Sequence, residues 1–248
     1  MKKYELHSVT IGYGEHIVAS SLSGALAEGE MVCLIGSNGT GKSTLLRTMA
    51  GFMPPINGKL TIDDKDITTL SRKEMAKTIA IVLTERTEVD NMTVSDLVET
   101  GRSPYTGFCG KLNRKDRDIV KKSLDMVGMT EFSMRMINTL SDGERQKVMI
   151  AKALAQQTPI ILLDEPMAFL DYPSKVETLR LLKRLCQEQH KAVLISTHDL
   201  DVAMRITDKV WIMTNDEKGN TTLVTGNCNE LKERIYSEFF YEAPSTII

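Results

Sequence analysis

One stretch of nine residues, 36–44, restricts the folds open to this chain more than any other feature. It reads Gly-Ser-Asn-Gly-Thr-Gly-Lys-Ser-Thr and fits the pattern of a phosphate-binding loop without a mismatch. An apolar run of strand length, residues 31–35, precedes it, and a helical pattern over residues 45–50 follows and ends at Gly51. The loop is therefore expected to join a buried strand to a helix, which predicts an α/β fold with a nucleotide-binding site.

The residues of this loop have separate chemical roles. Its glycines let the backbone turn so that NH groups point at phosphate oxygens, and the N-terminus of the following helix adds partial positive charge. Lys42 is expected to reach the β- and γ-phosphates, and the Ser43 hydroxyl to bind Mg²⁺. The predicted nucleotide-binding residues are Gly36, Ser37, Asn38, Gly39, Thr40, Gly41, Lys42, Ser43 and Thr44. An ordinary glycine-rich turn is the structural alternative, and the flanking strand and helix disfavour it.

The amino-acid composition limits the kinds of molecule with which the chain is expected to associate. Of the 248 residues, 42% are hydrophobic, which is enough for a core. The 31 basic and 33 acidic residues nearly cancel, so we expect no nucleic-acid partner. No apolar run approaches the roughly 18 residues of a membrane span, so membrane association is expected to require a partner. The cysteines are far apart and no secretory leader is recognised, which predicts free cytoplasmic thiols at Cys33, Cys109, Cys186 and Cys228.

The N-terminal part predicts a small antiparallel β lobe. Strands are expected at residues 4–10 and 17–22, and a third at 59–62 follows the turn signal Asn57-Gly58. Tyr13 lies between two glycines on a predicted turn, where an aromatic ring can stack on adenine. A surface or core tyrosine is the alternative for this residue taken alone.

Two later strands end in residues that suit catalysis. The apolar residues 160–163 lead into Asp164 and Glu165, and successive side chains of a strand diverge, so the two carboxylates should differ in role. Asp164 is expected to bind Mg²⁺, and Glu165 to accept a proton from the attacking water. A strand that ends in an acidic turn is the alternative. His198 follows another buried strand, 192–196, and lies at the same sheet edge if the sheet is parallel.

Residues of about 92–157 have helical spacing, which predicts a helical insertion in the α/β core, with residues 101–107 as a loop between two of its helices. A further helix opens at Ser141, with Glu144 three residues later. This pattern is a capping box, and a serine, Gly143 and exposed NH groups at a helix N-terminus also make a phosphate site. The sequence of this helix alone leaves both interpretations open.

Together these landmarks resemble the ATP-binding subunit of ATP-binding-cassette (ABC) transporters over essentially the whole chain. They fall in the family's order. Tyr13 matches the adenine-stacking aromatic, residues 36–43 match Walker A, and residues 140–144 match the LSGGQ signature, written here as LSDGE. Residues 160–164 match Walker B, followed by Glu165 as the catalytic glutamate, residues 168–171 match the D-loop, and His198 matches the switch histidine.

The resemblance implies one ABC ATPase domain over residues 1–248, with a P-loop NTPase core, an antiparallel β lobe and an inserted helical subdomain. It implies catalysis by Glu165, His198 and Lys42, and a nucleotide contact from Asp171 of the D-loop. It also implies a head-to-tail homodimer, with each ATP between Walker A of one chain and Ser141 and Gly143 of the other.

Two departures from the family pattern matter. Thr84 stands where the family's Q-loop has glutamine, and its hydroxyl is too short for the same reach, so the function of that glutamine is not assigned to Thr84 or to Glu85. Asp142 and Glu144 replace glycine and glutamine of the signature and add negative charge beside a phosphate site. We therefore expect weaker closure of the dimer, with function retained.

The subclass follows from residues 93–105 and 112–116, which are similar to importer ATPases for ferric siderophores, haem and cobalamin. This similarity implies two copies of the chain with an integral membrane permease and, indirectly, a substrate-binding protein, at the cytoplasmic face of the cell membrane. The alternatives are an ATPase for amino-acid, metal, lipid or export transport, or a soluble ABC ATPase outside transport.

Overall fold

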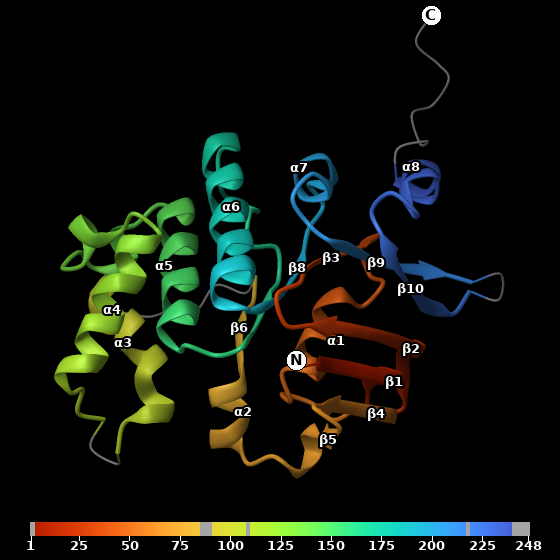
Figure 1. Cartoon of the computed structure of the whole chain (residues 1–248), viewed down its shortest axis with the longest axis horizontal. Coiled ribbons are helices and arrows are strands. Elements are labelled where there is room, and N and C mark those ends of the chain that lie inside the picture. Colours follow the sequence, from red (N-terminus) through yellow and green to blue (C-terminus); the bar gives the residue numbers. More distant parts are fainter. Residues whose placement is uncertain (1–2, 85–90, 108–109, 217–218, 240–248) are drawn as a thin grey trace, which may run out of the picture.

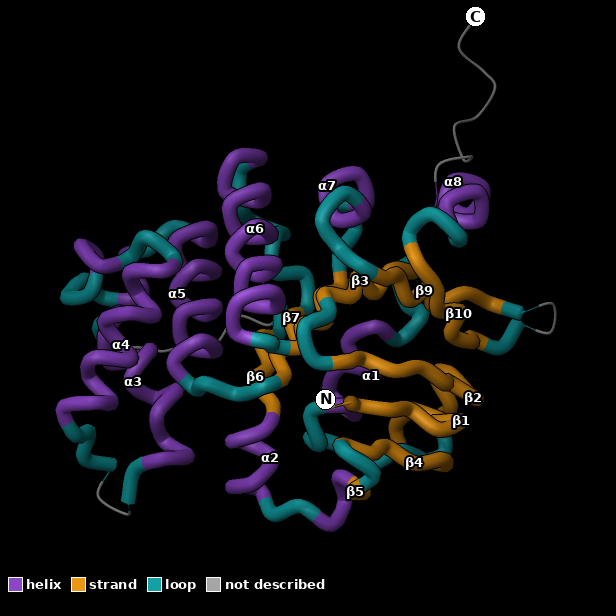
Figure 2. The backbone as a smooth tube through the Cα atoms, viewed as in Figure 1, coloured by secondary structure: helices purple, strands orange, loops and turns teal. Residues whose placement is uncertain are grey.

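The computed structural model describes residues 3–84, 91–107, 110–216 and 219–239. Within these ranges the strands form two sheets (Figures 1 and 2). The antiparallel sheet has the order β2-β1-β4-β5, made of β1 (Lys3–Tyr13), β2 (His16–Ala27), β4 (Asn57–Ile62) and β5 (Lys65–Asp66). The larger sheet has the order β10-β9-β3-β8-β7-β6, made of β3 (Met31–Gly36), β6 (Ile79–Val82), β7 (Ile160–Leu163), β8 (Ala192–Ser196), β9 (Lys209–Asn215) and β10 (Thr221–Asn227).

Five neighbouring strands of the larger sheet run parallel, and only β10 pairs antiparallel, with β9 at the edge. The parallel strands carry continuous apolar runs because both faces of the sheet are covered. All residues of β3 are buried, and successive side chains face opposite sides of the sheet: Val32 and Leu34 pack in one core, and Cys33 between them packs in another. The buried run that precedes the phosphate loop is thus the centre of the sheet.

The helices cover these faces in a fixed arrangement. α1 (Lys42–Met49) lies between the two sheets, where Leu45, Leu46 and Met49 pack in one core with both of them (Figure 1). α6 (Tyr172–Gln189) packs on the opposite face of the parallel sheet through Leu179 and Leu182. The remaining helices outside the insertion are α2 (Arg72–Thr78), α7 (Leu200–Met204) and α8 (Lys232–Phe239).

The helical insertion gathers beyond the β6 edge of the sheet (Figure 2). α3 (Val94–Glu99), α4 (Arg114–Met126) and α5 (Asp142–Ala155) share a core of their own, and each begins with a capping box. Short 3₁₀ turns connect the elements, over Ile67–Thr69, Thr100–Tyr105, Thr130–Phe132 and Ile137–Thr139. This arrangement supports the proposed helical subdomain within a single domain.

Some local expectations need correction. Residues 101–107 were expected to form a loop, whereas Thr100–Tyr105 is a 3₁₀ helix packed on α5. Tyr13 is the last residue of β1, because the β1–β2 pairing continues to Tyr13 and His16 and the turn follows it. Of the cysteines, Cys33, Cys186 and Cys228 have free thiols, and burial raises the pKa of Cys186 to about 12. Cys109 lies outside the described residues.

Candidate active site

The phosphate loop is held open by glycines where no side chain fits. Gly41, the N-cap of α1, has φ of 93°, in the left-handed region that favours glycine. A Cβ atom on Gly41 would lie 2.5 Å from Cγ1 of Val18 on β2. Gly36 ends β3, and a Cβ there would lie 2.7 Å from the carbonyl oxygen of Met213 on β9. The loop is therefore wedged between the two sheets, with its backbone close to both.

Lys42 folds back over the loop that precedes it. Its ammonium donates hydrogen bonds to the carbonyl oxygens of Gly36, at 2.7 Å, and Ser37, at 3.2 Å. Burial lowers the pKa of Lys42, against the opposing attraction of the carboxylates of Glu165 and Asp164. A cation is thus held at the mouth of the loop, where an anion can pair with it.

Asp164 and Glu165 follow β7, and one hydroxyl from the neighbouring strand joins them. Ser196 Oγ donates to Asp164 Oδ1 at 2.6 Å and accepts from the backbone NH of Glu165 at 2.9 Å. Ser196 is fully buried at the end of β8. Ser196 was not predicted as a site residue, because a serine that ends a buried strand is common. The only sequence signal was its place at the end of the strand beside the acidic pair.

Glu165 has an unusual backbone and a shifted carboxyl. Its φ of 49° is rare for a residue with a Cβ atom, and such strain gathers at functional sites. Its Oε1 lies 3.0 Å from Nε2 of His198. Burial raises the pKa of the Glu165 carboxyl, and this effect exceeds the lowering by His198 and Lys42. A carboxylate whose pKa is raised in this way takes up a proton more readily than a free glutamate, as a general base must.

These groups line one cavity of about 410 Å³. It brings together the phosphate loop, the acidic pair and the histidine from three neighbouring parallel strands, β3, β7 and β8. The lining residues are Val18, Asn38, Gly39, Gly41, Lys42, Ser43, Thr44, Asp164, Glu165 and His198. The cavity therefore joins a cradle for an anion to a candidate base.

Two of the predicted residues lie beside this cavity and help to shape the loop. The Tyr13 hydroxyl is 3.3 Å from Thr44 Oγ1 and accepts from Arg47 at 3.4 Å, and the Tyr13 side chain is half exposed. Thr40 Oγ1 donates to the carbonyl oxygen of Ser37 at 2.9 Å and so closes the turn. The aromatic ring is thus next to the helix that follows the loop.

Three further predicted residues, Ser141, Gly143 and Asp171, lie outside the cavity lining and do not belong to the phosphate loop. Ser141 caps α5, and its hydroxyl lies 2.8 Å from Oε2 of Glu144. Gly143 allows α5 to approach the carbonyl oxygen of Phe169, which would be 3.0 Å from an added Cβ. Asp171 caps α6 by accepting from the NH of Ser174 at 3.1 Å, and hydrogen bonds from Ser174 lower the pKa of Asp171. Ser141 and Gly143 belong to the start of α5, a helix of the insertion that lies away from α1 (Figure 1).

Thr84 has a structural contact at the end of β6. Its hydroxyl donates to the carbonyl oxygen of Asp164 at 3.1 Å and so ties the ends of β6 and β7 together. The contact is to the backbone and leaves the Asp164 carboxylate free for Ser196. Glu85, the other residue considered at this position, lies outside the described residues.

The raised pKa of Glu165 gives a prediction for stability. The folded protein holds this proton to a higher pH than the unfolded chain, so ionisation of Glu165 lowers stability as pH rises through this interval. Glu165→Gln removes that cost, and we expect the variant to unfold at a higher temperature than the parent at about pH 7, with the gain vanishing towards about pH 4. Thermal unfolding across this pH range measures it.

Glu188→Gln, at an exposed position of α6, is the control for loss of one negative charge and should show no such gain. A gain for Glu165→Gln that is independent of pH, or a lower unfolding temperature at neutral pH, would contradict the assigned environment of the carboxyl.

Known proteins match this sequence over most of its length. The iron(3+)-hydroxamate import ATP-binding protein of Bacillus subtilis is 40% identical over 84% of this chain and 77% of its own. The ferric enterobactin transport ATP-binding protein of Escherichia coli is 36% identical over 92% of this chain and 84% of its own. The chain is thus similar over most of its length to proteins that carry an ATP-binding description.

The fold and the family agree with these relatives. A bacterial ABC transporter cassette solved as a dimer superimposes with a TM-score of 0.75 at 31% identity, covering 84% of this chain and 93% of the other. Residues 19–168 match the family described as ABC transporter, and this range contains the phosphate loop, the signature sequence and the acidic pair. The chain belongs to the ABC transporter family, as one of its ATP-binding, ATP-hydrolysing subunits.

Proposed function

We propose that this chain energises an importer that takes up an iron–siderophore, haem or cobalamin-type substrate through a partner permease. The observation that carries the proposal is the 40% and 36% identity to the hydroxamate and enterobactin importer subunits. The segment 93–105 supports the same subclass, since its similarity to such importers was evident from the sequence. The sequence alone leaves open an ATPase of another transporter class or a soluble ABC ATPase, and the descriptions of these relatives do not favour either alternative.

In this proposal the phosphate loop holds the β- and γ-phosphates of ATP. Lys42 exchanges its contacts with the carbonyl oxygens of Gly36 and Ser37 for phosphate oxygens, and backbone NH groups of the loop complete the cradle. Tyr13 stacks on the adenine from the end of β1. Each contact uses a group that already lies at or beside the cavity.

Glu165 is the proposed general base of hydrolysis. It accepts a proton from the attacking water, and its raised pKa brings it closer to the neutral range in which such a base is most effective. His198, 3.0 Å from Glu165, is placed near the γ-phosphate, and Lys42 offsets charge as the bond breaks. Ser196 fixes the backbone of Glu165 and the carboxylate of Asp164 relative to each other through two hydrogen bonds.

Ser43 and Asp164 are the proposed ligands of Mg²⁺. Both line the cavity, and a hydroxyl with a carboxylate matches the oxygen donors that Mg²⁺ takes together with phosphate oxygens. When bound, the ion supplies charge neutralisation on the phosphate oxygens. The Asp164 carboxylate is oriented for this by the Ser196 hydroxyl.

The proposed active unit is a head-to-tail homodimer, in which each ATP lies between the phosphate loop of one chain and Ser141 and Gly143 of the other. A cassette with 31% identity to this chain was solved as a dimer, which supports a dimeric unit. It also accounts for a helix N-terminus and signature sequence that lie outside the cavity of their own chain. Asp171 belongs to the same proposed contact region as the residue that ends the D-loop.

The acidic residues of the signature sequence are expected to weaken closure of this dimer. Hydrogen bonds from the Ser141 backbone NH and hydroxyl lower the pKa of Glu144, so a charged carboxylate lies 2.8 Å from the hydroxyl that is to meet the γ-phosphate. Arg135 lies 3.6 Å from Glu144 and offsets part of this charge. The dimer should therefore close less tightly than one with glutamine at residue 144.

Among the described residues, none of the helices has the length and apolar character needed to span a bilayer. The proposed location at the cytoplasmic face of the cell membrane rests on the importer relatives. In this proposal an integral membrane permease holds two copies of the chain there, and a substrate-binding protein acts on the other side of the membrane.

Hydrolysis by the purified protein tests the role of Glu165. Glu165→Gln should bind ATP as the parent does and lose roughly 10²-fold or more of turnover, because the general base is gone while the phosphate loop is intact. Turnover is measured as phosphate release, and binding with a fluorescent ATP analogue. Glu188→Gln is the control for charge. Parental turnover in Glu165→Gln would rule out this carboxylate as the base.

Uptake tests the transport proposal. Cells that carry Glu165→Gln at the native locus should lose uptake of one labelled substrate among a ferric siderophore, haem and cobalamin, and keep the other two. The selective loss would assign both transport and cargo. If the variant is present at the parental level and all three substrates still enter, the importer subclass is wrong, and ATPase stimulation by DNA or ribosomes would then favour a soluble ABC ATPase.

A further inference from the structure

The segment Thr100–Tyr105 contains a buried arginine whose function the proposed ATPase cycle does not assign. Arg102 is 4% exposed and lies on the 3₁₀ helix that joins α3 to the rest of the insertion. Charged side chains are rarely this deeply buried unless they are paired. The contacts of Arg102 therefore indicate what it holds together.

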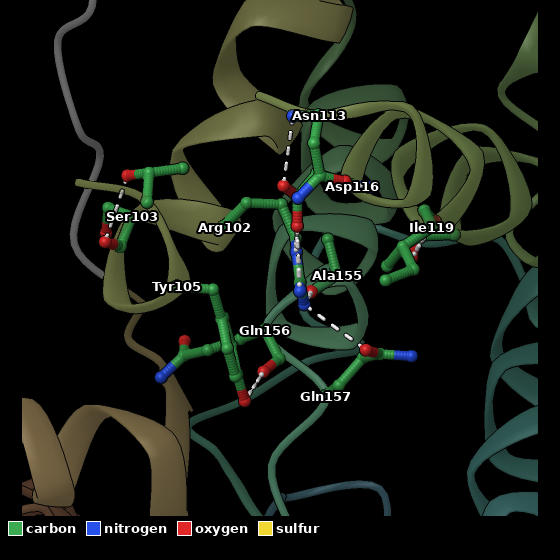
Figure 3. A network of polar contacts seen from close by, with 11 residues as sticks. Arg102, Ser103, Tyr105, Asn113, Asp116, Ile119, Ala155, Gln156 and Gln157 are labelled. Atoms are coloured by element: carbon green, nitrogen blue, oxygen red, sulfur yellow. Dashed lines mark hydrogen bonds and ion pairs between the residues drawn. The ribbon is translucent and has the colours of Figure 1, made fainter. Parts of the chain in front are cut away.

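Arg102 joins two helices of the insertion (Figure 3). Its Nε and one terminal nitrogen lie 3.0 Å from Oδ1 of Asp116 on α4. Its other terminal nitrogen donates to the carbonyl oxygen of Ala155, the last residue of α5, at 2.7 Å, and to Gln157 Oε1 at 3.3 Å. The guanidinium thus crosslinks α4 to the C-terminal end of α5.

Gly101 and Tyr105 pack closely around this crosslink. Gly101 places the 3₁₀ helix against the last turn of α5, where an added Cβ would lie 2.4 Å from the carbonyl oxygen of Lys152. The Tyr105 ring lies 4.1 Å from the guanidinium carbon of Arg102, and its hydroxyl donates to the carbonyl oxygen of Gln156 at 2.9 Å. A larger residue at 101 would separate the two elements.

Gln156 extends the contact to the sheet. Its side-chain amide donates to the carbonyl oxygens of Ala76, at 2.5 Å on α2, and Ile79, at 2.9 Å on β6. The C-terminal end of α5 is therefore fixed on one side to α4 by Arg102 and on the other to the core of the domain. Arg102, Tyr105, Asp116, Gln156 and Gln157 are called the α5 anchor below.

A buried ion pair is a poor source of stability alone, because desolvation offsets the attraction between the charges. Its geometry is the more informative property. Arginine offers donors in a rigid fork, which here meets a carboxylate, a backbone carbonyl and an amide oxygen from three directions. The anchor therefore defines where α5 ends and how it is oriented.

The other end of α5 is the N-cap Ser141, followed by Gly143. The helix has 14 residues, so the anchor lies about 20 Å along its axis from the signature sequence. A small rotation at the anchored end becomes a larger displacement at the other end. Since misplacement by about 1 Å can cost 10²-fold in rate, the direction of α5 matters at this distance.

We propose that Arg102 is a positioning residue of the ATPase, which fixes the direction of α5 and so places Ser141 and Gly143 against the nucleotide held by the partner subunit. The proposal rests on the ATP-bound dimer of the proposed function. Arg102 touches neither the nucleotide cavity nor the residues that line it. Its effect is therefore confined to steps that need the second chain.

The test separates nucleotide binding from dimer closure. The background is Glu165→Gln, which should hold ATP without rapid turnover, and the anchor variant is Arg102→Met with Asp116→Asn, which leaves no unpaired buried charge. We expect the affinity of the monomer for a fluorescent ATP analogue to stay at the parental value. The ATP concentration that half-converts monomer to dimer, measured by analytical ultracentrifugation, should rise about tenfold or more.

A matched control separates the proposed positioning effect from a general loss of stability in the insertion. Val120→Ala, on the same helix as Asp116, opens a cavity in the core of the insertion and leaves the α5 anchor intact. It should leave ATP-dependent dimerisation near the parental value even where its unfolding temperature is lowered as much as that of the anchor variant. Arg102→Lys should restore little of the loss, because an ammonium does not reproduce the fork.

Each result decides the matter. Dimerisation of the anchor variant at the parental ATP concentration would overturn the inference, and so would an equal loss in Val120→Ala. If the Glu165→Gln parent itself remains monomeric with ATP, the dimer of the proposed function is overturned, together with the inference that rests on it. Loss in the anchor variant alone, with monomer binding unchanged, supports the positioning role.

Discussion

The parallel pairing of β3, β8 and β7 is the constraint on which the site depends. Because parallel neighbours end at one edge of a sheet, this pairing brings the phosphate loop, the acidic pair and His198 to a common cavity. The Ser196 hydroxyl then fixes the positions of the two acidic residues, since it forms hydrogen bonds with both the Asp164 carboxylate and the Glu165 backbone NH. Without this register, residues more than 150 positions apart along the chain would not meet.

Much of this arrangement could be predicted from the sequence, for physical reasons. The phosphate loop and the parallel strands can be recognised in the sequence, because strands buried on both faces are continuously apolar and the loop needs its glycines. Ser196 and Arg102 could not be predicted as important. A serine at a strand end and an arginine in a Gly- and Pro-containing segment usually face solvent, and only the packing of distant elements buries both here.

In the proposed homodimer, each chain contributes two separate parts to the nucleotide sites. The cavity contains the phosphate loop and Glu165, the proposed phosphate-binding and base groups, whereas α5 begins outside the cavity, where the Ser141 hydroxyl contacts Glu144 of the same chain. A second copy that supplies Ser141 and Gly143 would complete the contacts around the γ-phosphate. In that arrangement the buried anchor at the C-terminal end of α5 has a purpose, because the helix must present its first turn to a surface of another molecule.

The central claim is that each nucleotide site is shared between two chains, and mixing two inactive variants tests it most directly. Lys42→Ala removes the phosphate-loop cation, and Ser141→Arg blocks the signature, so each variant alone should hydrolyse no ATP. A mixed dimer contains one site with a native Lys42 from one chain and a native Ser141 from the other. We predict that mixing the two variants restores ATPase activity. A mixture as inactive as its components would contradict a shared site.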